Sequence, residues 1–145
     1  MLPSEAAGMM AEYAQDAVDM ARDKFQIDLD YSLESIELLN IILQSLFDAM
    51  PTGWQLLYRR RPTKRKLRTL SKTWGGYLGE VIRREWGGQW LVPGDGPFKG
   101  GVTLLVQGTM LSPIARAHKQ LVNGVEASVA AYVASLIPVF SRPVE

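Results

Sequence analysis

Apolar side chains recur every three or four positions along three long segments of the chain, the spacing that places them on one face of an α-helix. The first segment covers residues 9–25. The second begins near Ser32, a residue suited to capping a helix N-terminus, and stops before Pro51. The third runs from a capping Thr63 to Trp86, where a pair of glycines ends it. The pattern therefore predicts three long helices.

Shorter elements are expected in the rest of the chain. Two short strands are predicted, at "QWLV" (89–92) and at "VTLLVQ" (102–107), where Val102, Leu104 and Val106 lie on one face. A loop rich in glycine and proline joins these runs, and Gly108 interrupts the second one, so we expect one β-hairpin. Two further helices are predicted, at residues 113–123 and at about 126–137.

The chain has no internal repeat and no long low-complexity linker. The segment between Pro51 and Pro62 fits both a strand and a helical turn, and we treat it as a connector. A chain of 145 residues can bury about two thirds of the surface that its unfolded form exposes. We therefore expect one α+β domain over residues 1–145, helix-rich with about five helices and packed with a small antiparallel β-hairpin sheet.

Five glycines lie in the stretch "WGGYLGEVIRREWGGQWLV" at 74–92. Gly75 and Gly79 are one helical turn apart on the flank of the apolar face, where each glycine disfavours the helix by roughly 1 kcal/mol relative to alanine. A phosphate-cradling turn needs its glycines between a strand and a helix, whereas these lie within a helix. We therefore expect them to admit a neighbouring segment rather than a ligand.

The composition limits the chemistry that the chain can perform and the cell compartment in which we expect it. The chain has no cysteine, which excludes disulfides, thiolate nucleophiles and cysteine-bound metals and favours a reducing cytoplasm. The N-terminal segment is acidic and lacks the basic region of a secretion signal. The apolar, uncharged run at residues 127–141 has fifteen residues, fewer than the roughly 20 needed to cross a bilayer. We expect a cytoplasmic protein without a membrane segment.

Charge is unevenly distributed, although the formal net charge is only +1. Residues 1–50 hold ten acidic and two basic side chains, net −8, whereas residues 51–84 hold ten basic and one acidic, net +9. We define the acidic stripe as four carboxylates on one side of the first predicted helix: Glu12, Asp16, Asp19 and Asp23. The basic segment consists of Arg59, Arg60, Arg61, Lys64, Arg65, Lys66 and Arg68.

Three interpretations of the basic segment stay open at the level of sequence: solvated or internally paired charge, contact with a protein partner, and contact with nucleic acid phosphates. The acidic stripe is either a solvated face or a docking surface for a basic partner. A metal ion needs oxygen ligands from several directions, which one helix face does not supply. We therefore expect no metal site in the acidic stripe.

Few residues offer catalytic chemistry. Glu80 precedes Arg84 by four positions, the favourable order for a helical ion pair, and this predicts a structural role. His118 is the only histidine, and the chain lacks the further ligands or nucleophile that a zinc site or a hydrolase needs. We expect no catalytic residue, no cofactor site and no enzymatic activity.

Three stretches resemble motifs found in a loose group of uncharacterised, often small bacterial proteins, some of which occur with polymorphic toxins and their immunity proteins. The stretches are "IDLDYSLESIELLN" at 27–40, "GGYLGEVIRREWGGQW" at 75–90, and the pattern Lys119, Leu121, Asn123, Gly124, Glu126 followed by Tyr132. The middle stretch is the most specific, although alanine is expected in similar proteins where Gly76 stands. The resemblance covers about a third of the chain. It implies a shared fold, a bacterial origin and a role in protein binding.

These observations favour a non-catalytic, cytoplasmic bacterial protein that binds another protein through the acidic stripe and the basic segment. The resemblance implies a toxin-immunity or secretion-associated role. The alternative is a nucleic-acid-binding protein that uses residues 59–72. The last predicted helix is largely uncharged, and an apolar face left uncovered there would form a homodimer.

Overall fold

Helices dominate the computed structural model of the protein, which describes residues 1–140. The part described has five α-helices, two short 3₁₀ helices and three strands, so the predicted helix-rich α+β fold is confirmed. In chain order the elements are α1 Pro3–Phe25, α2 Ser35–Asp48, η1 Gly53–Leu57, α3 Lys64–Trp86, β1 Gln89–Leu91, β2 Thr103–Val106, β3 Thr109–Leu111, α4 Pro113–Asn123, η2 Gly124–Ala127 and α5 Val129–Leu136.

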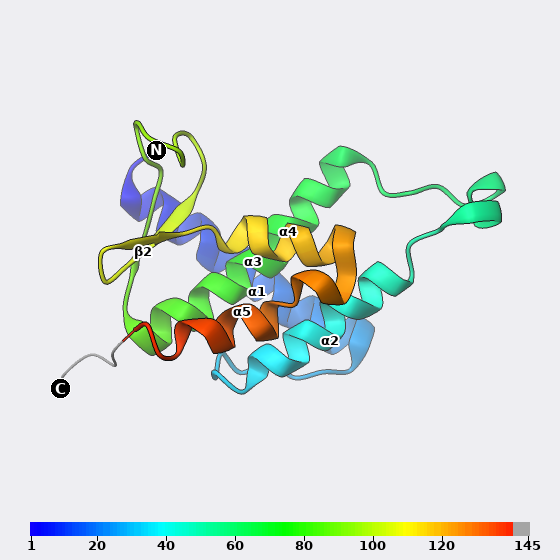
Figure 1. Cartoon of the computed structure of the whole chain (residues 1–145), viewed down its shortest axis with the longest axis horizontal. Coiled ribbons are helices and arrows are strands. Elements are labelled where there is room, and N and C mark those ends of the chain that lie inside the picture. Colours follow the sequence, from blue (N-terminus) through cyan, green and yellow to red (C-terminus); the bar gives the residue numbers. More distant parts are fainter. Residues whose placement is uncertain (141–145) are drawn as a thin grey trace.

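Helix α3 is the central element of the fold, with α1 packed on one side and α4 on another (Figure 1). Its N-terminus is capped by Thr63, whose Oγ1 accepts a hydrogen bond from the Lys66 amide at 3.1 Å. Gly87 ends the helix with a positive φ of 79°. Both predicted ends are therefore confirmed. The middle of α3 is almost entirely buried, from Ser71 to Ile82.

The glycines of α3 allow three neighbours to approach it. A Cβ atom at Gly75 would lie 2.5 Å from Ile114 Cα, at the start of α4. At Gly76 it would meet the Met10 carbonyl oxygen of α1 at 3.2 Å, and at Gly79 it would overlap the indole ring of Trp90. The prediction that these glycines serve close packing is confirmed.

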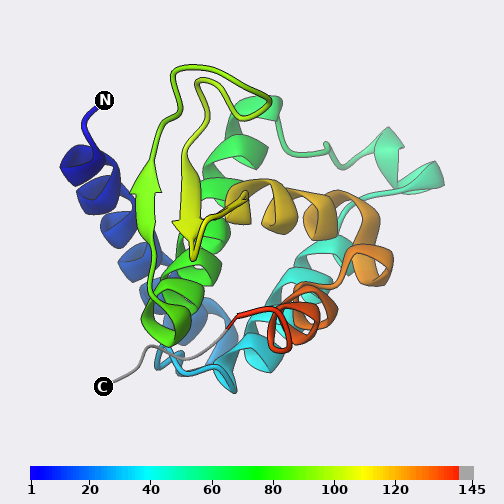
Figure 2. The same cartoon turned by 60° about the vertical axis from the view of Figure 1, so that its left-hand side comes forward.

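The sheet has three antiparallel strands in the order β1–β2–β3, one more than the predicted hairpin. Trp90 pairs with Leu104 in the first hairpin, and Leu104 pairs with Leu111 in the second. Gln107 and Gly108 both have positive φ, 46° and 81°, as a tight two-residue hairpin turn requires. Gly108 therefore turns the chain back into β3 rather than ending the sheet. In Figure 2 the sheet lies beside α1 and α3, with the long β1–β2 loop at one end.

Three helix boundaries differ from the predicted ones. Helix α1 begins at Pro3, ahead of residue 9, because Pro3 suits the first helical turn and Ala6 is already buried. Helix α2 begins at Ser35, and the Ser32 side chain caps the preceding turn by accepting from the Ser35 amide at 3.1 Å. Helix α5 is shorter than expected and is capped by Ser128, because residues 124–127 form η2.

The apolar face of α5 is covered within the chain itself. Val129 and Val133 are buried, and α5 packs against α2. The buried side chains of this face pack within the chain, and the possible homodimer stays a prediction. Among the described residues, no helix combines the length and the apolar character that crossing a bilayer requires.

Candidate interaction surface

The chain between α2 and α3 forms an arm that projects away from the helical body (Figure 1). We define the arm as residues 52–62. Its 3₁₀ helix η1 starts with a capping box, in which Thr52 and Gln55 each bond the other's backbone amide, so the helical alternative for this connector is the correct one. No residue of η1 is buried. The apolar side chains of η1 therefore do not contribute to the core of the body.

Those apolar side chains form an exposed tip. Leu57 is 86% exposed, Trp54 68% and Tyr58 65%, and the rings of Trp54 and Tyr58 lie 5.5 Å apart between centroids. By contrast Trp74, Trp86 and Trp90 are buried. Sequence reasoning missed this tip, although two adjacent leucines between Pro51 and Pro62, outside any helical stripe, were a signal for it.

The base of the arm is joined to the body by a hydrogen bond and is bordered by a cavity. The Arg59 guanidinium donates to the Ala49 carbonyl oxygen at 3.2 Å and so satisfies an acceptor at the end of α2. A cavity of about 540 Å³ lies between arm and body, lined by residues that include Phe47, Arg61 and Leu67. The arm therefore stands away from the core instead of packing onto it.

The basic segment continues from the arm into the first turns of α3, and all seven of its side chains are exposed. Within residues 1–140, no ion pair joins any of them to a carboxylate. These cations repel one another, and the positive N-terminal end of the α3 dipole disfavours them further. The segment therefore presents an uncompensated positive surface that favours a negatively charged partner.

The acidic stripe lies along the solvent side of α1. Glu12, Asp16 and Asp23 are exposed and Asp19 is half-buried. Arg22 on the same helix pairs with Asp19 at 3.2 Å and with Asp23 at 3.4 Å. Surface pairs of this kind contribute little stability. In the part of the chain that the structure describes, the acidic stripe and the basic segment do not pair with each other, and no three acidic or histidine side chains converge as a metal site would need.

Glu80 has a structural role, but its partner differs from the predicted one. Its side chain is buried and accepts from Arg83 Nε at 2.7 Å and from Trp90 Nε1 at 3.0 Å. Burial acts to raise the pKa of the Glu80 carboxyl, yet these hydrogen bonds and the nearby arginine charges outweigh it and hold the pKa below its usual value. Arg84 instead lies over the ring of Tyr31, 3.7 Å from its centroid.

The first two motif stretches meet at Tyr77. Its hydroxyl accepts from the Tyr31 amide at 2.9 Å and bonds Ser35 Oγ at 2.6 Å. Ser35 Oγ gives its own proton to the Ser32 carbonyl oxygen, so Tyr77 donates to Ser35. Burial raises the pKa of Tyr77. Every polar group in this cluster has a partner within the fold, which gives the cluster a packing role.

The third stretch, within residues 119–132, bonds to the first stretch at Asn40. Gln120 donates to the Asn40 carbonyl oxygen at 3.3 Å and accepts from the Val129 amide at 2.8 Å. The Ser128 hydroxyl donates to Asn40 Oδ1 at 2.7 Å. These bonds connect α2, α4 and the start of α5. The three motif stretches thus connect helices to one another.

Comparisons with protein-family models, with curated proteins and with solved structures find no match to the chain.

Proposed function

We propose that the protein is a non-catalytic binding protein whose arm docks into a complementary site on another protein. The observation that carries this proposal is the exposed tip, where Leu57 is 86% exposed beside Trp54 and Tyr58. A folded chain gains nothing by holding three large apolar side chains in water on a projecting element. Burial in a partner would remove that apolar area from water, at roughly 25 cal/mol per Å².

The chemistry of the arm also defines the partner. Tryptophan, tyrosine and arginine are the residues that most often dominate the binding energy of protein interfaces, and the arm offers all three within the sequence "WQLLYRRR" at 54–61. The partner site would be an apolar pocket with an acidic rim, because Arg60 and Arg61 lie two and three positions after Tyr58 of the tip. Arg59 is not counted in this rim because its guanidinium already donates to the Ala49 carbonyl oxygen.

A protein partner accounts for the tip better than nucleic acid does. Single-stranded nucleic acid stacks on free aromatic faces, whereas Trp54 and Tyr58 lie against each other at 5.5 Å. Leu57, the most exposed side chain of the tip, has no ring to stack on a base. In line with the motif resemblance, we propose a bacterial cytoplasmic setting in which the partner is a toxin or a secretion component.

The test places a photo-crosslinking amino acid at position 57 and identifies the crosslinked protein from the native host by mass spectrometry. The interaction is then measured with purified partner. Leu57→Ser is expected to weaken binding by about tenfold or more, the effect of removing an interface anchor. Val125→Ser is the matched control, because Val125 is 71% exposed but lies in η2, outside the arm. Equal binding by both variants would contradict docking through the tip.

Nucleic-acid binding by residues 59–72 remains the second candidate, supported by the unpaired cations of the basic segment. Its test is binding to random duplex and single-stranded DNA at low salt. If phosphates are the ligand, the affinity falls steeply with salt, and Lys64→Ala/Lys66→Ala reduces the salt dependence. Absence of DNA binding at low salt would remove this candidate.

A further inference from the structure

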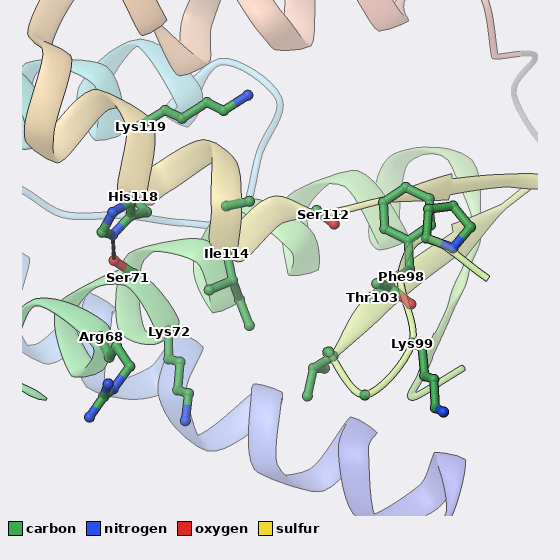
Figure 3. A pocket seen from close by; sticks show the side chains of 15 residues that line it. Arg68, Ser71, Lys72, Phe98, Lys99, Thr103, Ser112, Ile114, His118 and Lys119 are labelled. Carbon is green, nitrogen blue, oxygen red and sulfur yellow. Dashed lines mark hydrogen bonds between the residues drawn. The ribbon is translucent and has the colours of Figure 1, made fainter. Parts of the chain in front are cut away.

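A second cavity, of about 640 Å³, lies at the junction of α3, α4 and the β1–β2 loop (Figure 3). Its volume is within the roughly 300–1,000 Å³ typical of sites for small molecules. The lining comes from three separate segments: residues 68–72 of α3, residues 97–103 of the loop and β2, and residues 112–119 around α4. Sequence patterns are local, so they could not predict that these three segments lie next to one another in the fold.

The charges around this cavity have one sign. Arg68 and Lys72 come from α3, Lys99 from the loop and Lys119 from α4, and no carboxylate is among the lining residues. In Figure 3, Arg68 and Lys72 lie on one side of the cavity and Lys99 on the other, and all three extend in the same general direction, whereas Lys119 points the other way. Three cations from two segments without a local counter-ion favour a ligand with more than one negative charge, such as a phosphate monoester.

A polar pair lies inside the same cavity. Ser71 Oγ donates its only proton to the Leu67 carbonyl oxygen at 2.7 Å, so in its 3.0 Å bond to His118 Nδ1 it must be the acceptor. Nδ1 therefore carries a proton, and the ring is fixed in one tautomer. His118, expected on a surface or at a helix end, is half-buried in the middle of α4 with an oriented imidazole.

The remaining walls are apolar and suit a ring. Phe98, Pro97 and Val102 line one side and Ile114 lines another. The loop amides of Lys99, Gly100 and Gly101 all donate to carbonyl oxygens within the loop itself. An anion in this cavity would therefore be held by side chains, not by a backbone nest, and its organic part would contact the apolar walls.

We propose that this cavity binds a small phosphorylated compound with a planar ring, of nucleotide size. Lys72 and Lys99 contact the phosphate, Arg68 adds positive potential, and Phe98 and Ile114 contact the ring. No residue of this site belongs to the arm. A result that contradicts one proposal would therefore leave the other unaffected.

The test is titration of the full chain with adenosine 5′-monophosphate, adenosine and inorganic phosphate, by calorimetry and by NMR of the histidine ring. The single histidine makes the imidazole signals unambiguous. We expect the monophosphate to bind about tenfold or more tightly than adenosine or phosphate alone, because only it satisfies both the cations and the apolar walls. We also expect it to shift the His118 ring signals.

Two double variants separate this site from general attraction of anions. Lys72→Ala/Lys99→Ala is expected to weaken binding of the monophosphate by about tenfold or more, since a charged hydrogen bond contributes about tenfold or more in affinity. Lys64→Ala/Lys66→Ala is the matched control, because it removes the same charge from exposed positions outside the cavity, and it should leave the affinity within about twofold.

Four outcomes would overturn the proposal. These are adenosine binding as tightly as the monophosphate, unshifted His118 signals, equal losses in the two double variants, and binding of a single-stranded oligonucleotide without binding of the monophosphate. The last outcome would assign the cations to a nucleic-acid strand.

Discussion

Gly75 illustrates how one residue sets the distance between two helices. A Cβ atom at this position would lie 2.5 Å from Ile114 Cα and 2.9 Å from Ile114 N, and backbone atoms cannot rotate away. Gly75→Ala therefore forces α3 and α4 apart. We expect it to lower the free energy of unfolding by about 1–3 kcal/mol, the usual range for an overpacked core.

Gly8→Ala is the control for this prediction. Gly8 lies in α1, and a Cβ atom added there would have no neighbouring atom within 4 Å, so alanine adds helix propensity without a clash. We expect it to raise the free energy of unfolding by up to about 1 kcal/mol. Urea unfolding measures both variants. If Gly75→Ala were as stable as Gly8→Ala, the close approach of α4 would be wrong.

Glu80 is the only charged side chain that is buried within residues 1–140, and its environment predicts a pH dependence. Burial favours the neutral acid, but the bonds from Arg83 and Trp90 and the charge of Arg84 hold the pKa below the ordinary 4.5. A carboxyl whose pKa is lowered by folding stabilises the fold above its unfolded pKa. That contribution is lost as the pH falls through the folded value.

Glu80→Gln should therefore be less stable than the original protein above about pH 5, and the difference should shrink as the pH falls below about 4.5. Glutamine keeps an acceptor for Trp90 but has no charge for Arg83. The size of the effect is limited because Arg83 is 38% exposed. Chemical unfolding at several pH values measures it, with Glu12→Gln as an exposed control. A difference that does not change with pH would show that the charge of Glu80 is unimportant.

At the scale of the elements, Tyr77 fastens the α1–α2 connection to α3. The Tyr31 amide, in a residue with a positive φ of 65°, donates to the Tyr77 hydroxyl. Tyr77→Phe leaves that donor without its acceptor, at a cost of about 1–3 kcal/mol. We expect faster hydrogen exchange at the Tyr31 amide and at the start of α2. Tyr58→Phe, on the exposed arm, should change neither exchange nor stability.

The sequence predicted an element well where its signals were local. Thr63 and Gly87 set the ends of α3 through their own backbone and side-chain chemistry, and both positions were correct. The third strand was missed because its three residues, Thr109–Leu111, are too short for a pattern and Gly108 resembles a break. The predicted partner of Glu80 was wrong because Arg83 and Arg84 lie three and four positions after it, and both spacings allow an ion pair within a helix. Only the contact of Arg84 with Tyr31, which is distant in sequence, decides between them.

At the scale of the whole molecule, the basic segment, the apolar tip and the cavity around His118 differ in how far the sequence could reveal them. The basic segment was evident as a run of charge, and the structure adds that it is exposed and unpaired within residues 1–140. The apolar tip and the cavity around His118 were not predicted. Both depend on tertiary arrangement, since burial decides whether leucines are core or surface and the cavity exists only where α3, α4 and the loop meet.

The arm and the body should therefore be separable. Replacing residues 53–58 by a Gly/Ser segment of equal length removes the tip but keeps Thr52, Pro62 and the bond from Arg59 to the Ala49 carbonyl. Because no residue of η1 is buried, we expect the free energy of unfolding to change by less than about 1 kcal/mol. Binding to the protein partner should be lost, while binding of adenosine 5′-monophosphate should persist. Calorimetric unfolding and the two binding assays measure these effects. A loss of several kcal/mol would mean that the tip belongs to the core, and the case for a docking arm would fail.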